Sequence, residues 1–481
     1  MQLSPVLNIL GLLATILAAA MLIPMCVDLY LGSSDWHIFA LSALLTGFVG
    51  VSIWLATSRR EALDLGLRQA FLLTNGSWVM IGIFGSLPFM FSELDLSFTD
   101  SVFESISGIT TTGSTVLVEI EKASPGILIW RALLQWLGGV GIIVMAMAVL
   151  PMLSVGGMQL FRTESYESAE KVVPRATQLA GGIGLVYTAL TALWAMMLTF
   201  SGMSIFDAVA HSMTTLATGG YSTRTASIGA FDSVVIEWVI IAGMIVGSLP
   251  FAHYLAMVRG GWRGLLHDPQ VRWFLFLIFG LVLMLCWHLM QNGLGLGDAI
   301  RQASFNGVSI ITGTGYVSAN FSAWGGFATT ILLIVMFIGG CGGSTTCGIK
   351  VFRLQVLAST VKVQISRLLR PHAVVLAYYN KRPVSSEVMD SVMGFFYLYI
   401  LGFVVIALFL GMTGLDFVTA LSGAATSISN VGPGLGEVIG AEGNFSSIPD
   451  SAKWVMSFAM ILGRLEIFTV LVMLAPGFWQ R

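Results

Sequence analysis

Residues 100–114 read Asp-Ser-Val-Phe-Glu-Ser-Ile-Ser-Gly-Ile-Thr-Thr-Thr-Gly-Ser, an acidic residue and a Ser-rich run that leads into a glycine. Three further segments also open on Asp and end in a Gly-bearing stretch of small, uncharged residues. Each of the four lies between two long apolar runs, so we predict a repeating unit of helix, re-entrant loop and helix. The other three copies are Asp207-Ala-Val-Ala-His-Ser-Met-Thr-Thr-Leu-Ala-Thr-Gly-Gly-Tyr221, Asp298-Ala-Ile-Arg-Gln-Ala-Ser-Phe-Asn-Gly-Val-Ser-Ile-Ile-Thr-Gly-Thr-Gly-Tyr316 and Asp416-Phe-Val-Thr-Ala-Leu-Ser-Gly-Ala-Ala-Thr-Ser-Ile-Ser-Asn-Val-Gly-Pro433.

Four such units in one polypeptide can close a ring around a single axis, as four subunits do in a tetrameric channel. The repeats therefore predict a cation pore. The competing interpretation is that the glycines only allow close helix packing and that the aspartates are ordinary helix caps.

The composition places the chain in a membrane. Of its 481 residues, 56% are hydrophobic and only 10% are charged, and the mean hydropathy is positive. These values are typical of an integral membrane protein.

The charges are distributed unevenly between the two sides of that membrane. Assigning loops by alternation places 17 of the 23 basic residues on one face, which the positive-inside rule makes cytoplasmic. The opposite face carries many of the acidic residues, which can either concentrate cations at an outer mouth or be ordinary solvated loop residues. The 17 are Arg59, Arg60, Arg68, Arg162, Lys171, Arg175, Arg259, Arg263, Arg272, Lys350, Arg353, Lys362, Arg367, Arg370, Lys381, Arg382 and Arg481.

The apolar runs predict an all-α fold with ten spanning helices and both termini in the cytoplasm. Two helices precede the repeats, at 5–30 and 37–57. The longest cytoplasmic connection, 351–386, is too short to hold a folded core of its own. The four units are predicted as helix, loop and return helix at 70–92, 98–115 and 126–154; 178–200, 204–222 and 231–258; 271–291, 295–317 and 325–350; and 388–410, 414–434 and 451–475.

These elements divide the chain into five parts. An N-terminal pair of helices occupies 1–60, and the third part carries a glycine-rich segment within its return helix. The four pore repeats are expected at 61–156, 157–262, 263–356 and 357–481.

The ends of the four loops carry the chemistry of the predicted pore. Backbone carbonyls can hold a dehydrated monovalent cation without a strong fixed charge. Turning carbonyls towards one axis needs unusual torsions, which glycine adopts at little steric cost. We expect each short helix to start at its Asp and to point its partly negative C-terminal end at the axis. The predicted filter consists of Thr111, Thr112 and Gly113; Thr218, Gly219 and Gly220; Gly313, Thr314 and Gly315; and Asn430, Val431 and Gly432.

A second feature is the run Gly339-Gly-Cys-Gly-Gly-Ser-Thr-Thr-Cys-Gly-Ile-Lys350 within the third return helix. Each Gly in a helix costs about 1 kcal/mol relative to Ala, so this run is not expected to stay helical. Non-helical backbone at membrane depth is tolerated where protein shields it or where it lines water. We predict a movable constriction beneath the filter, with close helix packing as the alternative. The gate residues expected from it are Gly340, Gly342, Gly343, Ser344, Thr345, Thr346, Gly348 and Lys350.

Arg464 lies in Met460-Ile-Leu-Gly-Arg-Leu-Glu-Ile467, inside the last return helix. An ionisable group at that depth usually faces a pore or a partner. Glu466 is not expected to be that partner, because residues at i and i+2 do not share a helix face. We expect Arg464 to act as an electrostatic barrier or latch beside the glycine-rich run. A structural, Glu-paired or snorkelling Arg is the alternative.

The cysteines give no sign of redox or metal chemistry. Cys341 and Cys347 lie within the glycine-rich run without further ligands at metal-binding spacing, and no disulfide framework is indicated.

These motifs resemble the Trk/Ktr/HKT potassium-transporter superfamily over essentially the whole chain. The four loop ends, the glycine-rich run and Gly463-Arg-Leu-Glu-Ile467 carry the likeness, and the two additional N-terminal helices point to the TrkH branch. The resemblance implies a low-affinity-type potassium-uptake subunit of the bacterial inner membrane that works as a homodimer. It also implies a cytosolic TrkA-type nucleotide-binding ring as regulator, a carbonyl filter at the four glycines, and a gate formed by the glycine-rich loop and Arg464.

The resemblance implies no cofactor and no nucleic-acid partner, and potassium itself is the transported ligand. Gly219, Gly313 and Asn430 depart from the regular Thr-Val-Gly-Tyr-Gly filter of potassium channels, so cation selectivity is a firmer expectation than potassium over sodium or rubidium. The basic loops at 257–273 and 350–382 are candidate docking surfaces for the ring, although anionic lipid headgroups explain their charge equally well.

Two other classes of function compete with a passive pore. A secondary transporter coupled to sodium or proton entry would need intramembrane acids facing the pathway, for which Glu104 and Glu466 are the candidates. An intramembrane enzyme would need a paired nucleophile and base or a metal cluster, and the sequence offers neither. We therefore expect a transport protein.

Overall fold

The structure is a computed structural model that describes residues 3–58, 66–148, 157, 176–258, 260–261, 263–373, 375–380 and 382–480. In this part of the chain the fold is helical, apart from a short hairpin that pairs β1 (Tyr378–Tyr379) with β2 (Arg382–Pro383). The predicted all-α class is confirmed.

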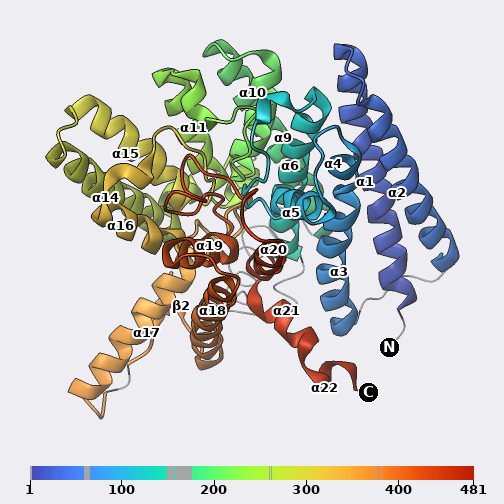
Figure 1. The fold of residues 1–481 in the computed structure, drawn as a ribbon. Coiled ribbons are helices and arrows are strands. Elements are labelled where there is room, and N and C mark those ends of the chain that lie inside the picture. The colour runs from blue at the N-terminus through green and yellow to red at the C-terminus, as the bar shows by residue number, and fades with distance from the viewer. Residues whose placement is uncertain are drawn as a thin grey trace.

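Within the described residues, seven helical segments are long and apolar enough to cross a membrane, which confirms a multi-pass membrane protein. The N- and C-terminal ends lie at the same end of the molecule, and α1 and α2 form one edge of it beside α3 (Figure 1). The seven are α1 (Ser4–Leu31), α2 (Trp36–Thr57), α3 (Leu67–Gly85) with the short α4 (Leu87–Phe91), α6 (Pro125–Ala148), α9 (Ala176–Phe200), α14 (Pro269–Gln291) and α18 (Ser386–Met412).

Two return helices that the sequence predicted as continuous are broken. The second, expected at 231–258, consists of α11 (Val234–Gly247) and α12 (Phe251–Val258), bent by 94°. The break ends at Pro250, which has no N–H to continue a helical ladder. The fourth, expected at 451–475, consists of α20 (Asp450–Arg464) and α21 (Ile467–Leu474), bent by 112°. Counting each bent pair as one span raises the total in the described residues from seven to nine.

The third return helix is also not continuous over 325–350. α16 (Gly326–Met336) is 11 residues long, which is too short to cross a membrane, and the chain is then non-helical until α17 (Val351–Leu369) begins. α17 projects from the end of the molecule at which the termini lie (Figure 1). The expected connection 351–386 therefore holds a helix and the β1–β2 hairpin.

Four short helices stand before the four predicted filter segments, and their starts differ from the expectation. The expected Asp cap is found in the fourth, where the side chain of Asp416 accepts from the N–H groups of Val418 and Thr419. In the first two helices the cap is a serine, Ser97 or Ser204. Its Oγ accepts the N–H of the Asp that lies three residues later, so the Asp is within the first turn. The third begins after Gly295 without a side-chain cap. The four are α5 (Phe98–Ile109), α10 (Ile205–Leu216), α15 (Leu296–Ile311) and α19 (Phe417–Ser429).

Polar and apolar side chains are distributed as expected for a protein that lies in a lipid bilayer. The short helices bury polar side chains such as Ser101, Thr214 and Thr426, while large apolar residues such as Phe276 and Leu408 are exposed on the outer helices. Lipid can cover the exposed apolar faces, and hydroxyls such as those of Thr214 and Thr426 find hydrogen-bond partners inside the protein. The remaining short elements are η1 (Ile120–Lys122), η2 (Ser227–Phe231), α13 (Arg263–His267), η3 (Phe321–Trp324) and α22 (Pro476–Trp479).

Part of the charge count and part of one helix lie outside the described residues. The end of the first return helix, predicted to reach residue 154, is among them, since α6 is described to Ala148. So are the basic residues Arg59, Arg60, Arg162, Lys171, Arg175, Arg259, Lys381 and Arg481.

Candidate functional site

The four predicted filter segments share one backbone pattern, in which two residues with positive φ are separated by a single residue. At the second of these positions the φ values are 88°, 79°, 79° and 104° for Gly113, Gly220, Gly315 and Gly432. At the first they are 55° for Thr111, 49° for Thr218, 67° for Gly313 and 55° for Asn430. Non-glycine residues rarely adopt positive φ, so its recurrence at one position in four segments indicates a shared structural requirement.

The residue between the two positive-φ positions is anchored in the same way in each segment. Its N–H donates to the carbonyl five residues earlier, near the end of the preceding short helix. Each segment is thereby tied to its own short helix. The four bonds run from Thr112 to Ser107 (2.9 Å), from Gly219 to Thr214 (2.9 Å), from Thr314 to Ser309 (2.9 Å) and from Val431 to Thr426 (3.1 Å).

The four segments contact one another in cyclic order. A Cβ built on Gly113 would lie 2.2 Å from the carbonyl oxygen of Gly219, in the second segment. One on Gly220 would lie 1.9 Å from the carbonyl oxygen of Thr314, and one on Gly315 would lie 2.0 Å from that of Val431. The circle closes at Gly432, whose added Cβ would lie 2.8 Å from the carbonyl oxygen of Thr112. Each glycine is therefore required twice, for its positive φ and because the next segment leaves no room for a side chain.

Side-chain hydrogen bonds reinforce these contacts. Ser114 Oγ donates to the Gly432 carbonyl over 2.8 Å. Asn430 Nδ2 donates to Thr112 Oγ1 over 2.9 Å, so the first and fourth segments are joined on two levels. Tyr316 joins the third segment to the second through its hydroxyl, which pairs with Thr214 Oγ1 at 2.5 Å.

A buried ion pair stands behind the first segment. Arg131 Nε donates to Glu104 Oε1 over 2.8 Å, and both side chains are at most 1% exposed. Glu104 also accepts from Thr115 Oγ1 and from the Val116 N–H, each within 3.1 Å. Glu104 is thus fully engaged in holding the chain that leaves the first segment.

A cavity adjoins the segments on the side reached by the residues that follow the glycines. All four glycines line it, together with Arg131 and Arg224, and none of its described lining residues is acidic. Glu121 lies near its rim and accepts from the N–H and the hydroxyl of Thr225. Burial opposes ionisation, but these hydrogen bonds outweigh it and lower the pKa of Glu121 below its ordinary value.

The glycine-rich run packs against the opposite side of the second segment. Thr345 Oγ1 donates to the carbonyls of Leu216 (3.0 Å) and Gly247 (2.8 Å), and it accepts from Thr218 Oγ1 over 3.2 Å. Thr345 thereby joins the run directly to a predicted filter residue.

The backbone of this run is bonded to the α11–α12 break, to α14 and to itself. The N–H of Cys341 donates to the Ser248 carbonyl at the α11–α12 break. The N–H of Gly342 donates to Gln270 Oε1 on α14 over 2.9 Å. The Gly339 N–H donates to the Ile349 carbonyl, which closes the run on itself. The expectation that it leaves the helical path and is shielded by protein is met.

Arg464 reaches the same place from the end of α20. Its guanidinium donates to the Thr345 carbonyl over 3.0 Å, to Cys347 Sγ over 2.6 Å, and to the Gly138 carbonyl over 2.9 Å. Arg464 is 2% exposed, so a full positive charge is buried between the glycine-rich run and α6.

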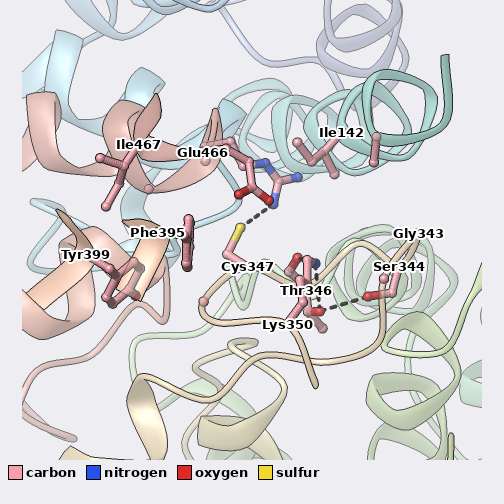
Figure 2. Close-up of a pocket in the computed structure, with 15 residues that line it drawn as sticks. Ile142, Gly343, Ser344, Thr346, Cys347, Lys350, Phe395, Tyr399, Glu466 and Ile467 are labelled. Carbon is pink, nitrogen blue, oxygen red and sulfur yellow. Dashed lines mark hydrogen bonds between the residues drawn. The ribbon is translucent and has the colours of Figure 1, made fainter. Parts of the chain in front are cut away.

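The residues around this contact enclose a cavity of about 20 Å³, which is room for one water molecule. Figure 2 shows Ser344, Thr346, Cys347 and Lys350 around it. Lys350 Nζ donates to the Thr346 carbonyl. Of the predicted gate residues, Gly342, Gly343, Ser344, Thr346, Gly348, Lys350 and Arg464 line the cavity, whereas Gly340 and Thr345 pack towards α11.

Glu466 does not pair with Arg464. This agrees with the expectation that residues two positions apart do not share a helix face. The Glu466 carboxylate accepts from Arg353 Nη2 over 2.5 Å, and the Arg353 guanidinium lies 3.8 Å from the centre of the Phe395 ring. Glu466 has a φ of 65° at the α20–α21 break. The ion pair therefore links the start of α17 to the bend in the fourth return helix.

Sequence reasoning missed two residues of the site on α6. Arg131 and Gln135 are at most 1% exposed, and both bond to the second segment. A signal was present, because two polar residues four apart share one face of an otherwise apolar membrane helix.

Comparison with known proteins assigns this arrangement to a family. A family model described as TrkH, cation transport protein, matches residues 36–480. The chain belongs to the TrkH family. The expected superfamily is confirmed, and so is the expectation of a transport protein rather than an enzyme.

Relatives and a solved structure match over the full length of the chain. It is 43% identical to the Trk system potassium uptake protein TrkI of Halomonas elongata, over 99% of this chain and 97% of the relative. It is 37% identical to TrkH of Escherichia coli, over 98% and 99% respectively. The crystal structure of the potassium transporter TrkH from Vibrio parahaemolyticus superimposes with a TM-score of 0.92 at 36% identity, covering 100% of both chains.

Proposed function

We propose that this chain is the membrane subunit of a low-affinity-type potassium-uptake system, through which K⁺ crosses the bacterial inner membrane passively. Its relatives that are named as Trk system potassium uptake proteins support this substrate. In this proposal the four helix–loop–helix units surround one pore. Ten spans result when α16, together with the glycine-rich run and α17, is counted beside the nine candidates.

The cyclic contact of the four segments is the observation that carries this proposal. Each filter glycine lies against a carbonyl of the next segment, so the four segments stand around a common centre. A dehydrated K⁺ needs several oxygens at fixed distance, and carbonyls from four sides supply them without a fixed negative charge. If the loops packed in an open row, the fourth segment would have no next neighbour. Instead, Gly432 of the fourth segment lies against the Thr112 carbonyl of the first, so the contacts form a closed ring.

The glycine-rich run and Arg464 serve as the gate in this proposal. Thr345 bonds to the base of the second segment, and Arg464 fixes the Thr345 carbonyl. In this proposal the cavity beside Arg464 lies on the ion path, and its volume of about 20 Å³ is room for one water molecule but not for a hydrated cation. The buried charges of Arg464 and Lys350 add an electrostatic barrier to K⁺. We infer that this arrangement is the closed state.

Regulation is proposed to come from a cytosolic TrkA-type nucleotide-binding ring that docks on a homodimer of the chain. α17 projects from the end of the molecule that holds the termini; it carries Lys362 and Arg367, and Arg370 follows directly after it. We propose that this end faces the cytoplasm. Since the start of α17 is bonded to the α20–α21 bend, a ring that moves α17 would act on the gate.

Coupling to sodium or proton entry is the alternative transport mechanism. The two acids that it would require are both paired, Glu104 with Arg131 and Glu466 with Arg353, which favours passive conduction.

The test is uptake of radioactive potassium into proteoliposomes that contain the purified chain, with sodium or rubidium as competitor. The proposal expects potassium uptake that continues without an imposed proton or sodium gradient. Uptake that requires such a gradient would establish the coupled mechanism instead. Protein that passes no monovalent cation under any of these conditions would contradict both mechanisms.

A further inference from the structure

Gln135, in the middle of α6, is bonded to the second filter segment at two points. We infer that Gln135 is a positioning residue that fixes the Gly219 carbonyl and thereby sets the preference of the pore for potassium over sodium. This inference rests on the proposed function, in which the four segments form the filter.

The contacts of Gln135 define its role and its orientation. Its Nε2 donates to the Gly219 carbonyl over 2.7 Å, and its Oε1 accepts from the Tyr221 N–H over 3.1 Å. A carbonyl can only accept and an N–H can only donate, so these two partners fix which way the amide points. The side chain is fully buried, and a Cβ on Gly219 would lie 2.4 Å from its carboxamide carbon. Gln135 therefore bridges the residues on either side of Gly220.

Arg131 makes a second contact one helical turn earlier on the same face of α6. Its Nη1 donates to the Ser222 carbonyl over 2.8 Å, and its guanidinium stacks 4.0 Å from the centre of the Tyr221 ring. Tyr221 in turn donates from its hydroxyl to the Glu104 carbonyl over 2.8 Å. The two α6 residues thus hold the second segment from Gly219 to Ser222 as one rigid piece.

The return helices α11 and α20 have no polar residues at the positions that correspond to Arg131 and Gln135 on α6. Three glycines mark equivalent places on their helices, because an added Cβ would contact the carbonyl four residues before a filter glycine. They are Gly138 against Ile109, Gly247 against Leu216 and Gly463 against Ile428. The residues seven and three positions before them are Arg131 and Gln135 on α6, Ile240 and Met244 on α11, and Met456 and Met460 on α20.

The consequence concerns a single carbonyl in the ring. The Gly219 oxygen lies against Gly113 of the first segment, so it belongs to the circle of contacts that closes the four segments. With one hydrogen bond from Gln135, this oxygen cannot swing inward to follow a smaller ion. A cage that cannot contract favours K⁺ over Na⁺, because sodium needs shorter distances to its ligands.

The variant that tests this is Gln135→Met, which installs the residue present at the equivalent positions on α11 and α20. It removes both hydrogen bonds while keeping side-chain volume and leaving no buried charge unpaired. Arg131 is unsuitable, because its removal would strand Glu104 in the interior. The matched control is Met244→Leu, at the equivalent position on α11. Gly220→Ser serves as a direct lesion of the filter.

The measurement is initial uptake of potassium and of sodium by bacteria that lack their own potassium-uptake systems. We expect Gln135→Met to lower the potassium-to-sodium uptake ratio by about fivefold, the factor that corresponds to one hydrogen bond of average strength. Met244→Leu should keep the parental ratio. Equal amounts of purified variant and parent, with thermal midpoints within a few degrees, show that the lost selectivity is not lost folding.

The outcomes separate this inference from the proposed function. A changed ratio in Gly220→Ser with an unchanged ratio in Gln135→Met overturns the role of Gln135 and leaves the filter in place. An unchanged ratio in both variants contradicts the filter itself. An equal fall in Met244→Leu and Gln135→Met overturns the inference, because general packing behind the segments would then account for the loss.

Discussion

Arg464 and Thr345 lie 119 positions apart in the chain, and the guanidinium of the first donates to the carbonyl oxygen of the second over 3.0 Å. The hydroxyl of Thr345 also accepts a hydrogen bond from Thr218, so a single residue, Thr345, lies between the Arg464 guanidinium and the predicted filter. The proposed gate and the predicted filter are therefore in direct contact through Thr345.

Replacing Arg464 with Ala is expected to raise unstimulated potassium flux about tenfold or more. The change removes three hydrogen bonds from a charged group, each worth about 1.5–3 kcal/mol, and it removes the positive charge beneath the filter. Flux into proteoliposomes without any regulator measures it. Arg367→Ala, on the exposed part of α17, is the control. Equal basal flux in Arg464→Ala and the parent would contradict the proposal that Arg464 holds the glycine-rich run in a closed position.

Thr345→Val tests the other half of the same contact. The substitution keeps the shape of the side chain but leaves the Leu216 and Gly247 carbonyls without their hydroxyl donor. We expect the glycine-rich run to loosen and the basal flux to rise several-fold. Thr330→Val, on an exposed face of α16, should leave the basal flux as it is. Equal basal flux in Thr345→Val and the parent would contradict the role of this hydroxyl.

Deletion across residues 340–348 should raise the basal flux further than Thr345→Val does. A deletion that abolishes conduction in folded protein would contradict the proposed gate.

Gly315→Ser is expected to weaken discrimination between potassium and sodium. Gly315 has a φ of 79°, and an added Cβ would lie 2.0 Å from the Val431 carbonyl oxygen, so that carbonyl must move. The same assay with Gly113→Ser should give the same direction of change. Gly280→Ala on α14 is the control, because nothing lies within 4 Å of its added Cβ. Unchanged preference in both serine variants would count against carbonyl selection.

Breaking the Glu104–Arg131 pair is expected to destabilise the protein strongly. Glu104→Gln leaves a buried guanidinium without its counter-charge, a lesion worth about 3–5 kcal/mol in other proteins. The double variant Glu104→Gln with Arg131→Met should recover part of the loss, since no charge remains buried. Thermal unfolding in detergent compares the three proteins. A single variant as stable as the parent would show that the pair does not hold the first segment.

The shared backbone of the four predicted filter segments could be foreseen from the sequence, because glycine is the residue type that adopts positive φ most readily. Gly113, Gly220, Gly315 and Gly432 recur at the same place after four similar runs, and positive φ favours glycine. The repetition made the inference possible, since one such glycine would have carried little weight. Thr111, Thr218 and Asn430 also have positive φ, but their residue types do not predict it, because contacts with neighbouring residues impose that conformation.

The breaks in the return helices were harder to foresee. Pro250 was a usable sign of the α11–α12 bend. Glu466 was not, because nothing in its residue type suggests a φ of 65°, and its ion pair with Arg353 spans 113 positions of sequence. Gln135 could be recognised as unusual in an apolar helix, but its partner is a backbone group, which sequence patterns do not reveal.

In the proposed pore, the closed circle of contacts from Gly113 through Gly432 has a consequence for how ion preference can change over time. In an assembly of identical subunits, one altered codon modifies every side of the ion cage at once. Here the four sides are encoded separately, so a single substitution alters one quarter of the ring and leaves three as they were. Ion preference of the proposed pore can therefore be tuned in small steps, and three of its four sides already differ within this chain, at Asn430, at Gly313 and at the amide behind Gly219.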